Sequence, residues 1–513
     1  MKNEQRILAE GALFTDLYQL TMAQLYFRMG IHQRQAQFEY FFRSNPDYGM
    51  HQAGYCISAG LECLVDWVQA SVFNKTEIDA LKTVKDRKGQ ALFAADFLAW
   101  LQERPISEGI TLRAIPEGRV IHPLVPIATV QGNLAMAQLL ETALLNQLNF
   151  QTLIATKAAR IAEVANGRTV LEFGLRRAQD RAATAGARAA LIGGANASSN
   201  TGASLALGFQ PSGTHGHSMV QAIAAMGGSE LDAFRAFAEL YPHNCVLLVD
   251  TFNTLESGIP NAIRVFEEMR RKGQEPLGVR LDSGDLAYLS IHTARMLDAA
   301  GFDQVQIVLS NQMDELTIWQ IITQIQSEAN RYGVDAQKLI NRLAYGVGTR
   351  LITSSGASAL DGVYKLVSVQ HNGQWVPTMK ISETPEKTLN PGIKSVWRIY
   401  DLSEKAIADL ICLADEKPAE MENLEFHHPT DPTKSRTIEK MNISSMEYMH
   451  EEIIREGKIV YEFPSIQQIR TIRKQDTERL YPGVKRLINP HIYHVSLSGN
   501  LWRLKNNLAE KIR

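Results

Sequence analysis

Two neighbouring stretches, Val246-Leu247-Leu248-Val249-Asp250 and Leu277-Gly278-Val279-Arg280-Leu281-Asp282, decide the fold of this chain. Each is a short apolar run that ends in a carboxylate and precedes a stretch with helical periodicity. This pattern is typical of a buried parallel strand followed by a helix. Between the two runs, apolar residues recur on one helical face and stop before Gly273. The pair therefore predicts a βαβ unit.

The same rhythm continues on both sides of this unit. Further apolar runs with polar or glycine ends are Leu171–Gly174, Ile307–Asn311 and Leu343–Gly348. From Asp250 onward, the strand ends follow one another at intervals of roughly 30 residues, which is the length of a βαβ repeat. We therefore predict a parallel α/β barrel over residues 151–369.

The chain on either side of the barrel has a different pattern. Residues 1–150 mix strand-like stretches, such as Phe38–Phe42, with amphipathic helical ones, which predicts an α+β domain of sandwich-like character. Residues 370–513 are strand-like and turn-rich, with a connector at Glu383-Thr384-Pro385-Glu386-Lys387, and form a third region. We expect strands near 370–400 to complete the N-terminal domain.

The composition excludes several classes of protein. Of the 513 residues, 45% are hydrophobic and 21% are charged, and the formal net charge of -2 predicts no nucleic-acid partner. No run approaches the roughly 18 apolar residues of a membrane span, and the N-terminus lacks the apolar core of a signal peptide. The four cysteines have no CxxC spacing, which predicts reduced thiols. We expect a cytoplasmic, globular protein with no membrane partner.

Aspartates at the carboxyl ends of the predicted strands are candidates for an active site, because in a parallel barrel these ends meet at one mouth. Asp250 and Asp282 occupy matched positions, with Asp285 beside them. They can hold ribose hydroxyls directly or through Mg²⁺. The alternative is that each aspartate only caps the following helix. The matched pair favours the site.

Later strand ends offer groups that can bind phosphate. Ser310-Asn311 and Gly346-Val347-Gly348-Thr349 end two strands, where barrel enzymes bind phosphate through backbone N–H groups and a helix N-terminus. The alternative for the second segment is a tight turn that needs glycine at positive φ. Arg176 and Arg177 follow another strand and can hold a carboxylate or phosphate, or else begin a solvated helix.

The segment Gly213-Thr214-His215-Gly216-His217-Ser218 places two histidines before a helical stretch. A histidine there can titrate near neutral pH, act as a nucleophile or be phosphorylated on nitrogen. Two histidines so close together also allow a metal-ligand interpretation. No HExxH or CxxC motif accompanies them, however, which argues against a metal site.

Near the N-terminus, Thr15–Met22 combines a helix-cap signal with an apolar stripe through Leu17, Leu20 and Leu25. This pattern predicts an ordinary amphipathic helix. Tyr18 lies off the stripe and is free to contact a ligand, although most such tyrosines only cover surface.

Taken together, these segments resemble the nicotinate phosphoribosyltransferase family, and the likeness runs from Thr15 to about Asn489. The matching segments occur in the family's order: TDLYQLTMA (Thr15–Ala23), LEFGLRRAQ (Leu171–Gln179), GTHGHS (Gly213–Ser218), VDTFNT (Val249–Thr254), VRLDSGDL (Val279–Leu286), LSNQMDE (Leu309–Glu315) and YGVGTRL (Tyr345–Leu351). The resemblance implies an irregular (β/α) barrel of the type II phosphoribosyltransferase kind, with an N-terminal α+β domain and a C-terminal extension.

The resemblance also implies an activity. Nicotinic acid and 5-phosphoribosyl-1-pyrophosphate would give nicotinate mononucleotide and pyrophosphate in NAD salvage, in a ligase-type reaction coupled to ATP hydrolysis with Mg²⁺ as cofactor. His217 corresponds to the family's phosphorylated histidine, whereas His215 occupies a more variable place. The likeness further implies a homodimer with shared active sites.

The resemblance assigns roles to the remaining site residues. The pyridine ring would lie between Phe173 and a tyrosine of the neighbouring subunit that matches Tyr18. Arg176 and Arg280 would lie near the nicotinate carboxylate and the phosphates. One further set would bind ribose and Mg²⁺: Asp250, Asp282, Ser283 and Asp285. Another set would bind the 5′-phosphate: Ser310, Asn311, Gly348 and Thr349.

The sequence leaves two rival functions to weigh. The related enzyme that uses nicotinamide carries an acidic residue about where Ser199 falls here. Since a carboxylate there would repel nicotinate, Ser199 favours the acid as substrate. A non-catalytic nucleotide-binding or scaffold subunit would lack a histidine, aspartate or glycine at the strand ends, and none is missing.

Overall fold

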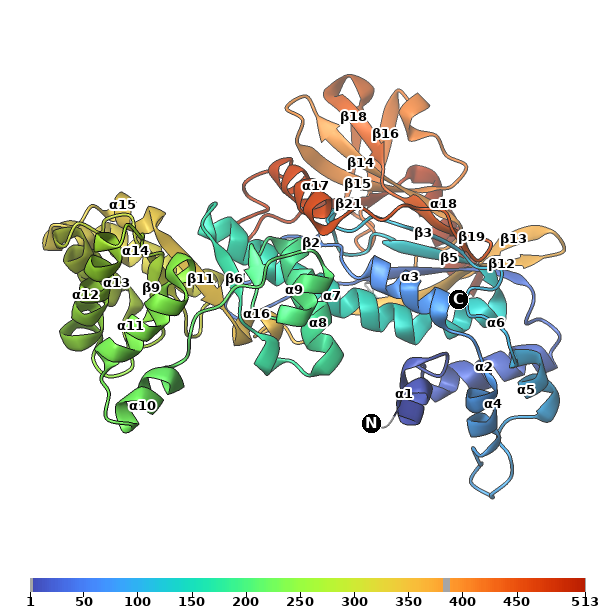
Figure 1. The fold of residues 1–513 in the computed structure, drawn as a ribbon. Helices are drawn as coiled ribbons and strands as arrows, with labels where there is room; N and C mark the ends of the chain where they lie inside the picture. The colour runs from blue at the N-terminus through green and yellow to red at the C-terminus, as the bar shows by residue number, and fades with distance from the viewer. Residues whose placement is uncertain (1–2, 382–387, 513) are drawn as a thin grey trace. The chain divides into compact units, whose positions relative to one another are not determined.

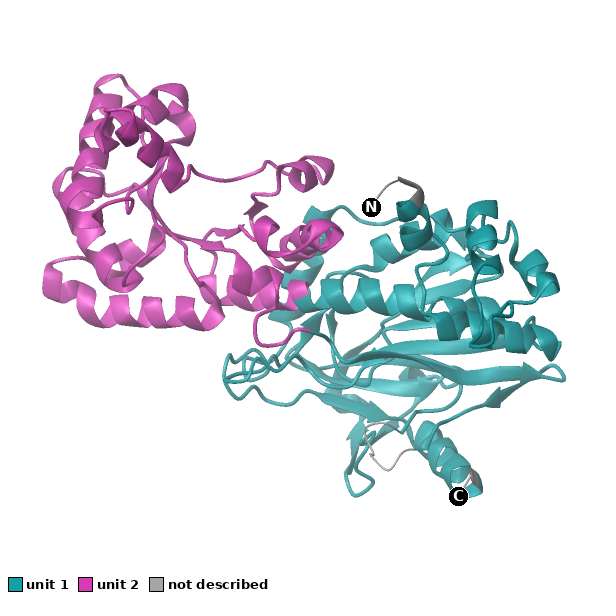
Figure 2. Cartoon of the chain, turned by 90° about the horizontal axis from the view of Figure 1, so that it is seen from below, with its two compact units in different colours: residues 1–153, 359–513 teal, residues 154–358 magenta. Residues whose placement is uncertain are grey.

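The computed structural model describes residues 3–381 and 388–512, and the chain divides into two compact units (Figures 1 and 2). Unit 1 comprises Met1–Leu153 and Ala359–Arg513, and unit 2 comprises Ile154–Ser358. The turn-rich connector predicted at residues 383–387 lies outside the described residues. Within the described ranges, no helix is long and apolar enough to cross a membrane.

Unit 2 is built on a six-stranded parallel sheet with the order β7-β6-β11-β10-β9-β8. The strands are β6 (Val170–Glu172), β7 (Ala197–Ser198), β8 (Val246–Leu248), β9 (Gly278–Leu281), β10 (Gln306–Leu309) and β11 (Leu343–Val347). Every neighbouring pair is parallel. Within the described residues β7 and β8 are the two edges, so the barrel is open between them. The predicted α/β class with an irregular barrel is confirmed.

Helices connect the strands of this sheet, as the sequence predicts. They are α8 (Asp180–Gly193), α9 (Thr201–Ala206), α10 (His217–Ala225), α11 (Glu230–Leu240), α12 (Ile259–Arg271), α13 (Leu286–Ala299), α14 (Glu315–Glu328), α15 (Ala336–Asn341) and α16 (Thr349–Ile352). In α12, Phe266 and Met269 are buried. Gly273 follows at φ +72, a left-handed conformation that glycine adopts without steric cost. The predicted glycine stop is therefore confirmed.

Unit 1 contains two large sheets. The first has the order β13-β12-β1-β5-β3-β19-β20 and the second β17-β16-β21-β15-β14-β18. The strands of the first sheet are β1 (Gln35–Phe42), β3 (Thr111–Ala114), β5 (Ala128–Asn133), β12 (Gly362–His371), β13 (Gln374–Pro377), β19 (Glu451–Arg455) and β20 (Lys458–Ile459). Strand β1 pairs with β5 on one side and with β12 on the other. Both ends of the chain therefore build this sheet.

The second sheet comes entirely from the C-terminal part of the chain. Its strands are β14 (Lys394–Asp401), β15 (Ala406–Leu413), β16 (Asn423–His427), β17 (Ser435–Glu439), β18 (Ile443–Tyr448) and β21 (His494–Leu497). A short pair, β2 (Cys56–Ile57) and β4 (Val120–Ile121), completes the strands of the unit. Its helices are α1 (Asn3–Glu10), α2 (Leu17–Arg28), α3 (Leu61–Ala70), α4 (Lys75–Lys82), α5 (Ala95–Leu101), α6 (Leu134–Leu139), α17 (Ile466–Glu478) and α18 (Gly499–Ile512). Helix α7 (Glu141–Ala165) contains the boundary between the units.

Helix α2 does not bury the predicted apolar stripe. Leu20 is buried, but Leu17 and Leu25 are 53% and 54% exposed. The buried face instead includes Gln19, whose Nε2 donates to Glu141 Oε2 at 2.9 Å. The stripe prediction was wrong because the position of the packing neighbour, and not side-chain hydrophobicity alone, decides which face of a helix is covered.

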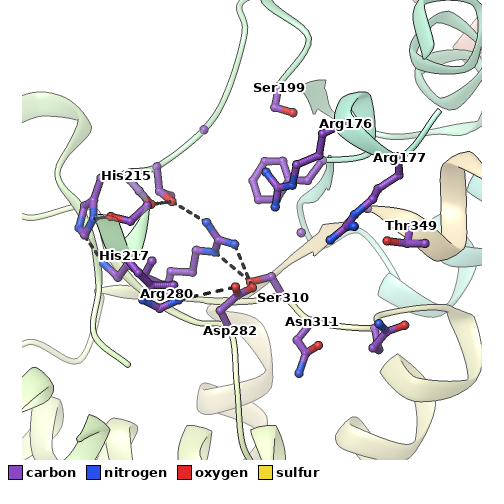
Figure 3. Close-up of a pocket in the computed structure, with 18 residues that line it drawn as sticks. Arg176, Arg177, Ser199, His215, His217, Arg280, Asp282, Ser310, Asn311 and Thr349 are labelled. Carbon is purple, nitrogen blue, oxygen red and sulfur yellow. Dashed lines mark hydrogen bonds and ion pairs between the residues drawn. The ribbon is translucent and has the colours of Figure 1, made fainter. Parts of the chain in front are cut away.

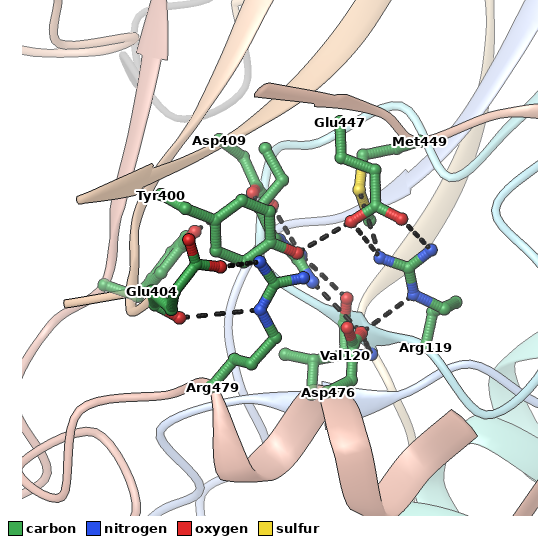
Figure 4. Close-up of polar contacts among 11 residues, drawn as sticks. Arg119, Val120, Tyr400, Glu404, Asp409, Glu447, Met449, Asp476 and Arg479 are labelled. Carbon is green, nitrogen blue, oxygen red and sulfur yellow. Dashed lines mark hydrogen bonds and ion pairs between the residues drawn. The ribbon is translucent and has the colours of Figure 1, made fainter. Parts of the chain in front are cut away.

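A buried network of charges connects β14, β15 and α17 in unit 1 (Figure 4). Arg398 is 1% exposed and donates to both carboxylate oxygens of Asp409, at 2.8 and 2.9 Å, and to Asp476 at 3.1 Å. Arg119 donates to Asp476 at 2.9 Å and to both oxygens of Glu447. Because each buried charge has an opposite partner, their desolvation is largely compensated.

Candidate active site

A cavity of about 360 Å³ lies in unit 2 at the carboxyl ends of the parallel strands (Figure 3). Nine predicted site residues line it: Phe173, Arg176, His217, Arg280, Asp282, Ser310, Asn311, Gly348 and Thr349. The cavity is also lined by Arg177, Ser199 and His215, which the sequence singled out without a settled role. The sequence thus places most of its candidate residues around one cavity.

Arg280, in β9, connects the groups at three sides of the cavity. Its Nε donates to Ser310 Oγ at 2.9 Å, its Nη1 to Thr214 Oγ1 at 3.0 Å, and its Nη2 to Asp282 Oδ1 at 2.9 Å. The guanidinium carbon lies 5.5 Å from the centroid of the Phe173 ring, within range of a cation–π interaction. The planar guanidinium group makes these contacts at once, so Arg280 fixes the relative positions of the cavity walls.

Asp250 does not line the cavity but contacts Asp282, which does. Its side chain is 2% exposed, and its Oδ2 accepts from Asp282 N at 3.1 Å and from Ser283 Oγ at 2.5 Å. Its Oδ1 is buried and has no hydrogen-bond partner among the described residues. Burying a carboxylate oxygen without a donor or a cation is unfavourable. Asp250 Oδ1 is therefore suited to a ligand group that carries positive charge or a donor.

The alternative role of the aspartates as helix caps applies to Asp285. Its Oδ1 accepts from the N–H groups of Ala287 and Tyr288 at the start of α13, both at 3.1 Å. Asp285 and Ser283 are not part of the cavity lining. Tyr18 belongs to α2 in unit 1, where burial and the negative charge of Glu141 raise its pKa to about 12.

His217 is the first residue of α10, and its side chain is 37% exposed. Its Nδ1 lies 3.2 Å from Thr251 Oγ1. Its Nε2 lies 3.8 Å from Asp250 Oδ1 and 3.9 Å from Asp282 Oδ2. The ring is thus held at one nitrogen and faces two carboxylates with the other.

His215 has a different environment, although it is only two residues away. It is 8% exposed, and its Nε2 accepts a hydrogen bond from Leu248 N at 3.0 Å. Burial lowers the pKa of His215, and the charge of Arg280 lowers it further. No group of three or more His, Cys, Asp or Glu residues in the described chain could hold a metal ion.

Phe173 forms one wall of the cavity, and Gly346 makes room for it. A Cβ atom on Gly346 would lie 2.6 Å from the Phe173 ring. Neither Gly346 nor Gly348 has a positive φ, so the turn-based explanation of these glycines was wrong. The turn after Phe173 is supported by the buried Glu172, which accepts from Ser198 Oγ at 2.5 Å and from Gly174 N. Burial raises the pKa of Glu172.

Arg176 and Arg177 lie on the turn η1 (Leu175–Arg177) and extend toward the cavity (Figure 3). Both side chains are exposed, so their guanidinium groups are accessible to an anionic ligand. Ser199 also lines the cavity and follows β7 directly.

Sequence reasoning missed the roles of Thr214 and Gln312. Thr214 stands out in the sequence only as a member of the histidine segment, and nothing there pairs it with Arg280. Gln312 lines the cavity with φ +49, next to Asn311 at φ +92. Asparagine often adopts left-handed φ and is therefore a weak sequence signal for such a turn, whereas glutamine gives none.

Comparison with known proteins gives the family. The model described as "Nicotinate phosphoribosyltransferase (NAPRTase) family" matches residues 169–404, and the models of the family's N-terminal and C-terminal domains match residues 13–149 and 393–505. A nicotinate phosphoribosyltransferase of Bacillus subtilis (strain 168) is 39% identical over 504 residues, which cover 98% of this chain and 96% of the relative. One of Bos taurus is 32% identical over 555 residues, covering 98% and 97%.

Solved structures that are similar to this chain support the same family. The crystal structure of human nicotinic acid phosphoribosyltransferase is similar with a TM-score of 0.79 and 29% sequence identity, covering 96% of this chain and 99% of that one. A nicotinate-nucleotide pyrophosphorylase of Pyrococcus furiosus has a TM-score of 0.66 at 22% identity, with 93% and 97% coverage, and shares the fold. The strand-end residues around the cavity, the family models and the relatives that match the chain over nearly its whole length lead to one assignment: the chain belongs to the nicotinate phosphoribosyltransferase family.

Proposed function

We propose that this protein joins nicotinic acid to 5-phosphoribosyl-1-pyrophosphate, releasing nicotinate mononucleotide and pyrophosphate, and that ATP hydrolysis through a phosphohistidine at His217 is coupled to this reaction. The observation that carries the proposal is the content of one cavity in unit 2. An aromatic face, the exposed guanidinium groups of Arg176 and Arg177, and the strand-end carboxylate of Asp282 meet there, with Asp250 directly behind Asp282. The substrates require these three kinds of group.

Nicotinate fits the side of the cavity near Phe173. The pyridine ring stacks on the Phe173 face, and Arg176 or Arg177 receives the carboxylate, since a guanidinium group matches a carboxylate with two parallel hydrogen bonds. Ser199 adds no negative charge to this side, which favours the acid over the amide. A second aromatic residue, Tyr18, would reach the ring from a neighbouring subunit of a homodimer.

The ribose and its phosphates fit the strand ends. Departure of pyrophosphate leaves positive charge on the ribose carbon, and the Asp250 and Asp282 carboxylates stabilise that charge. The 5′-phosphate would bind at Ser310, Asn311, Gly348 and Thr349, which also line the cavity. Ser283 and Asp285 would complete the ribose site beside Asp250.

Mg²⁺ fits the acidic pair. Mg²⁺ is usually held by one or two carboxylates together with substrate phosphates and water, and does not need a cage of protein ligands. Asp250 Oδ1, buried and without a hydrogen-bond partner among the described residues, together with Asp282 Oδ2, supplies such a pair. When bound, the ion would neutralise the charge of the leaving pyrophosphate.

His217 is suited to accept a phosphoryl group. Its Nδ1 contacts Thr251 Oγ1, so Nε2 is the nitrogen available for reaction. Attack of Nε2 on the γ-phosphorus of ATP forms the N–P bond and breaks the bond to the β–γ bridging oxygen, releasing ADP. The new negative charge would lie beside Asp250 and Asp282, and its repulsion from bound pyrophosphate would favour product release.

A pyrophosphate-release assay with nicotinate and phosphoribosyl pyrophosphate, with and without ATP, tests the proposal. We expect release with nicotinate, faster in the presence of ATP, and little with nicotinamide. A clear preference for nicotinamide would overturn the substrate assignment. Labelling with γ-phosphate-labelled ATP should give an acid-labile phosphoprotein that is absent in His217→Ala. Label that persists in this variant would overturn the role of His217.

A further inference from the structure

We infer that His215 is a positioning residue: its Nε2 fastens the segment before His217 to the open edge of the parallel sheet and thereby holds His217 over Asp250. The inference rests on the proposed function in one respect, namely that His217 is the reacting group. Residues 212–216 form the bridging segment.

The bridging segment spans the gap between the two edge strands of the sheet. At one end, Ser212 N donates to Ser198 O, in β7, at 3.0 Å. At the other end, His215 Nε2 accepts from Leu248 N, in β8, at 3.0 Å. The strands β7 and β8 are the edges of the sheet in the described part of the chain. The bridging segment therefore closes the barrel where no strand does.

The Leu248 N–H group points to the free side of β8. The next residue, Val249, donates its N–H to Arg280 O in the neighbouring chain segment at 3.2 Å. Successive N–H groups of a strand point to opposite sides, so Leu248 N–H points away from β9. A buried N–H of this kind needs an acceptor. The Nε2 atom of His215 supplies this acceptor. Leu248, the residue it contacts, lies two residues before Asp250 in the chain.

The surroundings of His215 keep it in the form that this contact needs. To accept from Leu248, the ring must be neutral, with its proton on Nδ1, which lies 3.4 Å from Gly216 O. The ring packs edge-on against Phe237, with centroids 4.9 Å apart. This buried, apolar setting favours the neutral ring.

The helix that carries His217 packs mainly against α11. Within α10, whose residues are all described, only Val220 is buried. Besides its own contact with Thr251 and the packing of α10 on α11, His217 is positioned by the bridging segment, which Thr214 fixes to Arg280 and His215 fixes to β8. An error of about 1 Å in the position of a reacting group is enough to lower a rate strongly.

Two variants of similar size test whether His215 acts through its hydrogen-bond acceptor or only by filling space. His215→Gln keeps an acceptor near the position of Nε2, whereas His215→Leu fills the space without one. We expect kcat/KM for pyrophosphate release with nicotinate to fall at least tenfold in His215→Leu and to stay within about threefold of wild type in His215→Gln. The rate of phosphohistidine formation should follow the same order. Thermal midpoints of both variants confirm that they fold.

Hydrogen–deuterium exchange of the full-length protein tests the contact without relying on activity. The peptide spanning residues 246–250 should exchange faster in His215→Leu than in wild type, and His215→Gln should restore the protection. Equal exchange in the two variants would overturn the contact, and restored protection with equal activity in the two variants would overturn the positioning role. A wild-type protein that releases no pyrophosphate would overturn the proposed function instead, while exchange would still decide whether His215 holds the segment to β8.

Discussion

His217 Nε2 lies 3.8 Å from Asp250 Oδ1, a buried carboxylate oxygen with no hydrogen-bond partner among the described residues. The chain thus places a carboxylate oxygen that lacks a hydrogen-bond donor in the described residues next to the histidine that we propose to react. Asp250 Oδ2, in contrast, is occupied by Asp282 N and Ser283 Oγ. One oxygen of Asp250 therefore positions Asp282 and Ser283, and the other is available to contact a ligand.

Replacing Asp250 by asparagine should remove the charge of its carboxylate while keeping the shape of the side chain. We expect Asp250→Asn to lower kcat/KM for pyrophosphate release at least about 100-fold, since the loss of one well-placed electrostatic group typically costs that much. The matched control is Asp298→Asn, which changes a surface aspartate that contacts Arg342 at 2.8 Å. A variant of Asp250 with activity within threefold of wild type would contradict the role of its charge.

Arg280→Lys should disconnect the cavity walls. A lysine carries one charged nitrogen and cannot contact Asp282, Ser310 and Thr214 with the geometry of a guanidinium group. We expect kcat/KM for phosphoribosyl pyrophosphate to fall about 10- to 100-fold, with a raised KM. Arg235→Lys, at an exposed contact with Glu268, is the control. If Arg280→Lys and Arg235→Lys have equal kinetics, the contacts of Arg280 with Asp282, Ser310 and Thr214 are dispensable.

Ser199→Asp should change the choice of substrate. A carboxylate at this wall of the cavity would repel the nicotinate carboxylate and could accept from the amide of nicotinamide. We expect the ratio of kcat/KM for nicotinate to that for nicotinamide to fall at least tenfold, measured in parallel assays. Ser199→Asn, of the same shape but without charge, should change the ratio less. An unchanged ratio in Ser199→Asp would place the ring elsewhere.

Arg398→Met should destabilise unit 1. The substitution leaves Asp409 buried without its cation, and breaking a buried pair on one side typically costs about 3–5 kcal/mol. The matched control is Arg28→Met at the pair with Asp96, whose side chains are 55% and 53% exposed; there the loss should stay below about 1 kcal/mol. Equilibrium urea unfolding at neutral pH gives both values. Similar losses would mean that burial does not govern the contribution of Arg398.

His450 should make the protein less stable in mild acid. Its ring is 4% exposed, and burial lowers its pKa to about 4, while its Nε2 lies 2.8 Å from Pro126 O. Above pH 6.5 both the folded and the unfolded states hold this histidine neutral, so it has no effect. As the pH falls from about 6.5 to about 4, only the unfolded state binds the proton, and stability is lost, by about 2 kcal/mol at pH 5.

The comparison of His450→Gln with wild type by urea unfolding at pH 7.5 and pH 5 measures this effect. The variant should lose about 2 kcal/mol less between the two pH values than wild type does. Other buried histidines, such as His122 and His215, still contribute, so the slope should decrease without vanishing. His243→Gln, at an exposed position, should leave the slope as it is. Identical slopes in His450→Gln and wild type would rule out His450 as a source of acid sensitivity.

The strands and helices of the barrel could be predicted because their signals are local. An apolar run with a polar end, such as Val246–Asp250, and a following helical face determine a βα unit within about 30 residues. Parallel strands also place their carboxyl ends at one edge, so the sequence alone is enough to expect that Asp282 and Ser310 meet. The sequence suggested that strands near residues 370–400 complete the N-terminal domain, but it could not give the pairing of β1 with β12 or its register, because this pairing joins residues that lie far apart along the chain.

The sequence by itself determined the barrel class, the family resemblance and nearly all residues that line the cavity. Only the tertiary structure decided how each of them is placed and which groups it contacts. It turned His217 toward two carboxylates and His215 into the sheet edge, made Asp285 a helix cap, and left one oxygen of Asp250 without a partner among the described residues. The physical reason is that the type of a residue sets the chemistry available to it, whereas its neighbours in space set its burial, its hydrogen bonds and its charge.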